Sequence, residues 1–196
     1  APLSDDEYLA LAVPFLGRGT EIGMFAQPKW STEPVLRKAA KTGLNFVRVG
    51  CNAGSGKAAE GTIKAARGLG LTVRFSMMKC YVLSPRELAE EALMLQSFGA
   101  QSITLMDSAG TMTPNMVSNY VFTVAEALDV PTGFHGHNNM GLSIANSLAA
   151  AESGVTSGRS ERLVNGTICR FAICFFSCAA LRQASGTSSP ISRRSV

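Results

Sequence analysis

The stretch QSITLMDSAGTMTPNMVSNYVFTVAEALDVPTGFH, residues 101–135, indicates the fold class. It begins with an apolar run at 101–106 and ends with a second apolar run at 130–135. Between them, Thr113-Pro114 predicts a helix start, because proline is favoured at the first helical position. The two runs begin about 30 residues apart, the length of one strand–helix unit of a parallel sheet.

The same rhythm continues toward the N-terminus. Three more apolar runs predict strands at 8–16, 44–50 and 71–78. Helix starts are predicted by the Ser84–Glu87 capping box and by Ser31 to Pro34. Four glycines follow amphipathic stretches and predict helix ends: Gly43, Gly70, Gly99 and Gly154. About five βα units with strands this apolar indicate an α/β protein whose parallel sheet is covered by helices.

A doubly wound sheet and a (β/α)8 barrel both fit this pattern. A complete barrel typically needs about 250 residues. With 196 residues, this chain would supply a partial barrel. The spacing of the runs leaves the choice between the two folds open.

The bulk composition narrows the class of protein. The chain is 46% hydrophobic and 16% charged, which is ordinary for one or two globular domains. No stretch has the pattern of a signal peptide, and no apolar run is long enough to span a membrane. Five cysteines without paired spacing indicate reduced thiols. We therefore expect a cytoplasmic protein that does not act at a membrane.

The strand–helix rhythm fails after Gly154, so we expect a catalytic domain at 1–154 and an atypical tail at 155–196. The tail holds eight serines, six arginines, three cysteines and a single acid, and carries a charge of +5. The remaining 154 residues carry −1, so no basic face for nucleic acid is expected. The tail is either a divergent C-terminal segment or, as we favour, a segment foreign to the fold, such as a translated frameshift.

The chain's two histidines lie in GFHGHNNMG, residues 133–141. On a strand, residues i and i+2 point the same way, so His135 and His137 would project side by side. The carboxyl ends of parallel strands carry the sites of α/β proteins. We interpret the pair as half of a divalent-metal site rather than as two hydrogen-bonded polar residues. A carboxylate as third ligand would favour Mg²⁺ or Mn²⁺, with Asn138 and Asn139 orienting the ligands.

A second constellation, MDSAGTMTP at 106–114, follows the preceding strand. Ser108 is a candidate contact for a substrate carboxylate. Asp107 would either contact substrate or support the loop amides, and Gly110 would let the backbone approach a ligand closely. Arg48, at the end of an earlier run, would either neutralise an anionic substrate or form an ion pair, and we favour the ion pair.

Two weaker signals do not carry a site. GSGK at 54–57 lacks both the first glycine and the Ser or Thr of a phosphate-binding loop. Cys169, Cys174 and Cys178 lack the two-by-two spacing of a zinc site. A zinc-binding module built on these tail cysteines stays open as an alternative.

Taken together, these motifs resemble the metal-dependent TIM-barrel lyases that include 3-hydroxy-3-methylglutaryl-CoA lyase and isopropylmalate synthase. The shared strand-end motif is H-x-H-N, matched by His135, His137 and Asn138. The acyl-CoA enzymes usually carry D-T-x-G on the preceding unit, whereas Asp107-Ser108-Ala109-Gly110 resembles the D-S-x-G of the 4-hydroxy-2-oxovalerate aldolases. The resemblance covers roughly residues 8–154 and also includes RVG and Met77-Met78.

The resemblance implies a partial TIM (β/α)8 barrel, with the five runs as strands 3 to 7. It implies a lyase of aromatic hydrocarbon catabolism that cleaves 4-hydroxy-2-oxovalerate to pyruvate and acetaldehyde. His135 and His137 would bind a divalent metal, Mn²⁺ before Mg²⁺ or Co²⁺, and Ser108 would bind the carboxylate of the small 2-oxo acid. The family's Arg-Asp pair and catalytic His would lie upstream of Ala1, so no residue of this chain is assigned as the base. The implied partner is an acylating acetaldehyde dehydrogenase.

Two alternatives to the aldolase remain. One is an acyl-CoA lyase or synthase of the same superfamily, against which Ser108 in place of Thr argues. The other is a non-catalytic truncated barrel, whose unpaired strand edges would favour aggregation or pairing with another chain.

Overall fold

The computed structural model describes residues 4–17 and 19–155. Its strands are β1 (Gly23–Ala26), β2 (Phe46–Asn52), β3 (Thr72–Met78), β4 (Ser102–Asp107) and β5 (Thr132–Gly136). Its α-helices are α1 (Asp5–Ala12), α2 (Glu33–Lys41), α3 (Glu60–Gly68), α4 (Pro85–Phe98), α5 (Pro114–Ala127) and α6 (Ser143–Val155). Short 3-10 helices occupy Val13–Phe15, Gly56–Ala59 and Cys80–Val82.

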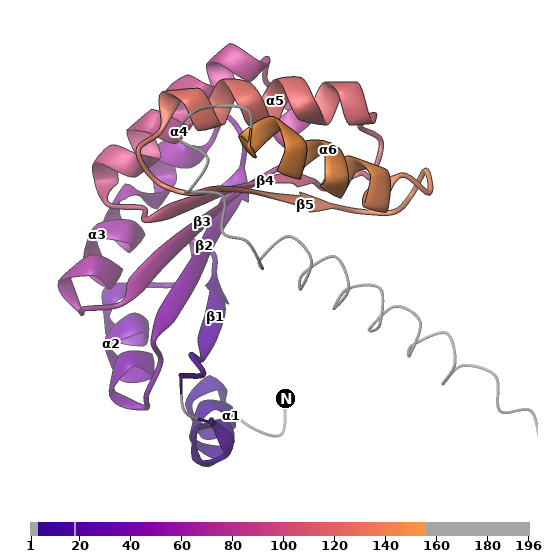
Figure 1. The fold of residues 1–196 in the computed structure, drawn as a ribbon. Helices are drawn as coiled ribbons and strands as arrows, with labels where there is room; N and C mark the ends of the chain where they lie inside the picture. The colour runs from indigo at the N-terminus through magenta and orange to yellow at the C-terminus, as the bar shows by residue number, and fades with distance from the viewer. Residues whose placement is uncertain (1–3, 18, 156–196) are drawn as a thin grey trace, which may run out of the picture.

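The five strands form one parallel sheet in the order β1-β2-β3-β4-β5. Each strand is followed by a helix, and helices α2 to α5 follow one another along the outside of the curved sheet (Figure 1). Sequential parallel pairing with a helix in every crossover is the arrangement of a (β/α) barrel. The prediction of a partial TIM barrel with five βα units is therefore confirmed.

The first predicted strand was wrong. Residues 8–15 belong to α1 and the following 3-10 helix, and β1 lies further along, at Gly23–Ala26. Helix α1 begins with a capping box, in which the Ser4 hydroxyl accepts from the Glu7 amide while the Glu7 carboxylate accepts from the Ser4 amide. This local signal fixes a helix where the apolar run alone cannot separate helix from strand.

The other predicted boundaries hold with one exception. The Ser84 capping box precedes α4, the Thr113 hydroxyl caps α5, and Gly99 ends α4 in the left-handed conformation. Gly154 was predicted to end a helix but lies within α6, which includes Val155. Residues 156–196, which hold the tail cysteines, fall outside the described residues, so the domain division at 154/155 and the zinc module stay predictions.

The two faces of the sheet differ in polarity. Alternate strand residues pack against the helices and are fully buried: Val47, Val49, Val73, Phe75, Met77, Ile103 and Leu105. The register places Arg48 opposite Arg74, Ser76 opposite Thr104, and Met106 opposite His135 on the other face. The apolar core therefore lies between the sheet and the helices, and the opposite face carries the polar residues.

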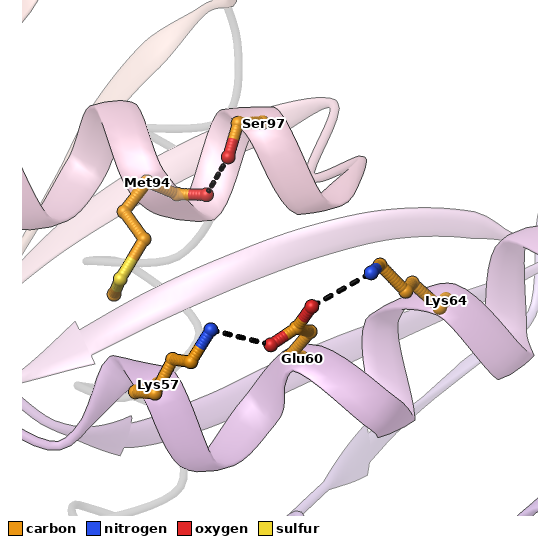
Figure 2. A network of polar contacts seen from close by, with 5 residues as sticks. All are labelled: Lys57, Glu60, Lys64, Met94 and Ser97. Atoms are coloured by element: carbon orange, nitrogen blue, oxygen red, sulfur yellow. Dashed lines mark hydrogen bonds and ion pairs between the residues drawn. The ribbon is translucent and has the colours of Figure 1, made fainter.

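A small ionic network stabilises the first turn of helix α3 (Figure 2). Lys57 and Lys64 each donate to the Glu60 carboxylate at 2.7 Å, and Lys57 also lies 4.9 Å from the centre of the Phe98 ring on α4. Hydrogen bonds from Lys57 and then Lys64 lower the pKa of Glu60 to about 2. The stabilisation that this contact contributes is thus fully present above pH 4.5 and is lost as the pH falls through about 2.

The two described cysteines are free thiols, and we expect both to react slowly with alkylating agents. Burial, followed by the nearby Asp107, raises the pKa of Cys80 to about 12, and burial followed by Glu91 raises that of Cys51 to about 11. Because the thiolate is the nucleophile, iodoacetamide at pH 8 should label Cys80 about a thousandfold and Cys51 about a hundredfold more slowly than in the unfolded chain. Peptide mass spectrometry measures both rates, with the guanidinium-unfolded chain as control. Equal rates in the two states would contradict the burial of these thiols.

Among the described helices, none has the length and apolar character that a membrane-spanning helix requires.

Candidate metal centre at the carboxyl ends of the strands

The two histidines lie together at the end of β5. His135 lies within the strand and His137 directly after it, with ring centres 5.1 Å apart in an edge-to-face arrangement of 62°. His135 is buried and His137 is half-buried. Burial, then His137, then Arg48 lower the pKa of His135 to about 4. Its imidazole is therefore neutral at pH 7, the form in which histidine binds a metal.

The donor set fits half of a divalent-metal site. Two adjacent imidazoles at a strand end suit a borderline divalent cation. Within residues 4–17 and 19–155, no group of three or more His, Cys, Asp or Glu side chains is placed to hold a metal. A complete centre requires a further ligand in addition to this pair.

Asp107 supports the loop after β4. Its Oδ1 accepts from the amides of Gly110 at 2.9 Å and Thr111 at 3.2 Å, and its Oδ2 accepts from Met112 at 3.0 Å. The side chain is fully buried. It lies on the helix-facing side of the sheet, the same side as Ile103 and Leu105. This placement favours the loop-supporting role over the substrate contact that the sequence also allowed.

Gly110 joins the loops after β4 and β5. Its φ is +65°, and a Cβ built there would lie 2.6 Å from the His137 carbonyl oxygen and 2.7 Å from the Asn139 nitrogen. The Met140 amide donates to the Gly110 carbonyl, and the His137 amide donates to the Asp107 carbonyl. The sequence suggested close approach to a ligand here. The structure shows that the backbone of residues 137–139 makes that approach.

Ser108 joins the loops after β3 and β4. Its Oγ accepts a hydrogen bond of 2.9 Å from the backbone amide of Lys79. Lys79 has φ +54° and ψ +43°, and among the described residues it is the only non-glycine with positive φ. Lys79 could not be found from the sequence, because nothing in Met-Lys-Cys signals a left-handed conformation.

Arg48 lies on the same face of the sheet as His135. It is in register with Arg74 on β3, which donates to Glu21 at 2.7 Å and stacks on the Phe46 ring at 3.9 Å. Burial and then Arg74 lower the pKa of Arg48. Arg48 also contributes to the lowered pKa of His135, so its positive charge acts at the candidate metal centre.

The two asparagines after the histidines are exposed. The Asn138 Oδ1 accepts from the Ser143 amide at 3.1 Å and so stabilises the start of α6. The Asn139 backbone packs against Gly110. Their role in orienting metal ligands stays a prediction.

The part of the chain that holds the candidate metal centre matches a known protein family. The HMGL-like family model matches residues 48–167, a span that contains the histidine pair and the Ser108 loop. The chain belongs to the HMGL-like family. The resemblance drawn from H-x-H-N and D-S-A-G is thereby confirmed.

Two relatives that are similar to this chain in sequence are both named 4-hydroxy-2-oxovalerate aldolase. A 4-hydroxy-2-oxovalerate aldolase of Carboxydothermus hydrogenoformans is 38% identical over 156 residues, which is 80% of this chain and 46% of that protein. An aldolase of the same name from Geobacillus genomosp. 3 is 40% identical over 141 residues, or 71% of this chain and 42% of that protein. The chain thus spans about half the length of the curated relatives it matches.

Solved structures show the same fold as this HMGL-like chain. The carboxyl transferase domain from Rhizobium etli pyruvate carboxylase matches with a TM-score of 0.71 and 18% identity. The match covers 98% of this chain and 40% of that one. At this identity the likeness establishes the fold alone.

Proposed function

We propose that this chain supplies the histidine pair and the carboxylate-binding serine of a divalent-metal-dependent lyase. The reaction would be the retro-aldol cleavage of 4-hydroxy-2-oxovalerate to pyruvate and acetaldehyde. The observation that carries the proposal is that Ser108 follows β4 and the pair His135 and His137 lies at the end of the neighbouring parallel strand β5, so all three are at the same edge of the sheet. The aldolase names of the relatives that share this region support it.

In this reaction the C4 hydroxyl loses its proton and C4–O becomes the carbonyl of acetaldehyde. The C3–C4 bond breaks, and its electron pair forms the enolate of pyruvate, which then takes a proton at C3. His135 and His137 would hold the metal, which when bound supplies Lewis-acid stabilisation of the developing enolate charge. Ser108 would donate to the substrate carboxylate, and Arg48 would add positive charge on the same side of the sheet. Among the described residues, none is assigned as the base that takes the C4 hydroxyl proton.

The finer assignments are part of the same proposal. We expect Mn²⁺ as the preferred ion, with Mg²⁺ or Co²⁺ able to replace it, because imidazole combined with carboxylate ligands suits these cations. We also expect a cytoplasmic location, a role in the catabolism of aromatic hydrocarbons, and an acylating acetaldehyde dehydrogenase that takes up the aldehyde product.

The test is Mn²⁺-dependent formation of pyruvate from 4-hydroxy-2-oxovalerate by the purified full chain, coupled to lactate dehydrogenase and NADH oxidation. Turnover that EDTA abolishes and Mn²⁺ restores would establish the reaction for this chain. Because pyruvate is also the product, its Mn²⁺-dependent binding measured by calorimetry is the second readout. Absence of both would overturn the proposal and favour a non-catalytic barrel. Consumption of acetyl-CoA with a 2-oxo acid would instead establish the acyl-CoA branch of the superfamily.

A further inference from the structure

We propose that the backbone amide of Lys79 is a positioning group that makes Ser108 a hydrogen-bond donor toward the substrate carboxylate. The inference rests on the proposed function, in which Ser108 contacts that carboxylate. It adds a residue from a third strand end, that of β3, to a site otherwise built from β4 and β5.

The Lys79 amide constrains the direction in which the Ser108 hydroxyl can donate. The Ser108 Oγ can donate one hydrogen and accept others, and it already accepts from the Lys79 amide at 2.9 Å. Its own hydrogen must then point away from Lys79. A carboxylate only accepts hydrogen bonds, so a serine that binds one must donate. The Lys79 amide thus selects the orientation of Ser108 that a 2-oxo acid requires.

The backbone of Lys79 is held in an unfavourable conformation to present this amide. A left-handed conformation is unfavourable for a non-glycine residue, and such residues tend to cluster at functional sites. The Lys79 carbonyl accepts from the Val82 amide, and the preceding Met78 carbonyl accepts from the Ala53 amide, so the turn is held on both sides. The Lys79 side chain is exposed, so burial of that side chain does not account for the strain.

The proposal separates the backbone of Lys79 from its ammonium group. Glycine and asparagine tolerate the left-handed conformation and keep the amide, so Lys79→Gly and Lys79→Asn should preserve the hydrogen bond to Ser108. Valine strongly disfavours this conformation because it is β-branched, so Lys79→Val should move the amide away. The ammonium group is lost in all three variants.

The experiment measures pyruvate affinity of the Mn²⁺-loaded full chain by calorimetry. We expect Lys79→Gly and Lys79→Asn to stay within about twofold of the unchanged chain. Lys79→Val and Ser108→Ala should each weaken binding by roughly tenfold or more, as for a lost hydrogen bond to a charged group. The double variant Lys79→Val, Ser108→Ala should be no weaker than Ser108→Ala, because both changes remove the same interaction. Unchanged Mn²⁺ affinity reports that the site is still folded.

A second readout needs neither metal nor substrate. Hydrogen exchange by NMR should show the residue 79 amide protected in the unchanged chain and in Lys79→Gly, and exposed in Ser108→Ala. Equal weakening by all three Lys79 variants would assign the effect to the ammonium and overturn the inference, as would additive effects in the double variant. If the unchanged chain binds no pyruvate while the amide protection still depends on Ser108, it is the proposed function that fails.

Discussion

A double variant, His135→Ala and His137→Ala, is expected to lose Mn²⁺ binding. The two rings lie 5.1 Å apart, and His135 is neutral at pH 7 because its pKa is lowered to about 4. Substitutions that only orient metal ligands typically cost 10–100-fold in affinity. Removal of two ligands should therefore raise the Mn²⁺ dissociation constant by more than about 100-fold, as measured by calorimetry.

The matched control is Ile144→Ala. Ile144 lies in the first turn of α6 and is 78% exposed, so its truncation removes no buried contact near the histidines. We expect unchanged Mn²⁺ affinity for this variant and a cooperative melt for both proteins. An unchanged dissociation constant in the double histidine variant would contradict the assignment of His135 and His137 as metal ligands.

The strands with continuous apolar runs could be predicted from the sequence. Strands β2 to β5 coincide closely with the runs at 44–50, 71–78, 101–106 and 130–135, because strands buried on the helix side need such runs. Strand β1 could not be found in this way. It has only four residues, GMFA, and Phe25 is 46% exposed at the open edge of the sheet.

The site was predictable in part, because residue spacing on a strand sets direction. The i, i+2 spacing of His135 and His137 predicted their proximity, which the structure shows. The hydrogen-bond partners of Asp107 and Ser108 could not be predicted from spacing. They are adjacent in sequence, yet the Asp107 carboxylate turns to the loop amides while the Ser108 hydroxyl meets the Lys79 amide. The Ser108 contact depends on how the loop after β3 is placed beside the end of β4, which no pattern within residues 101–114 encodes.

These contacts connect the loop after β4 to both neighbouring loops at the carboxyl ends of the strands. It is bonded to the loop after β3 through Ser108 and Lys79, and to the loop after β5 through Gly110 and Met140. A change at Gly110 should therefore be transmitted to the histidines without altering a single metal ligand.

A Gly110→Ala variant is accordingly expected to weaken Mn²⁺ binding by about tenfold or more, the scale of a lost ligand-orienting contact. The added Cβ would lie 2.6 Å from the His137 carbonyl oxygen and 2.7 Å from the Asn139 nitrogen. Both are backbone atoms, so the segment that carries His137 must shift to relieve the contact. The residue must also keep a φ of +65°, which costs about 1–2 kcal/mol for alanine.

The control for this variant lies in the neighbouring loop. Gly141 has a φ of +73°, but a Cβ placed there would meet nothing within 4 Å. Gly141→Ala therefore imposes the same left-handed strain, about 1–2 kcal/mol in the free energy of unfolding, without displacing the histidines. Mn²⁺ calorimetry and thermal melting of the two variants separate the effects. If both variants lose Mn²⁺ affinity equally, the contact between Gly110 and the His137 backbone does not set the geometry of the metal ligands. Backbone strain in these loops would then account for the loss.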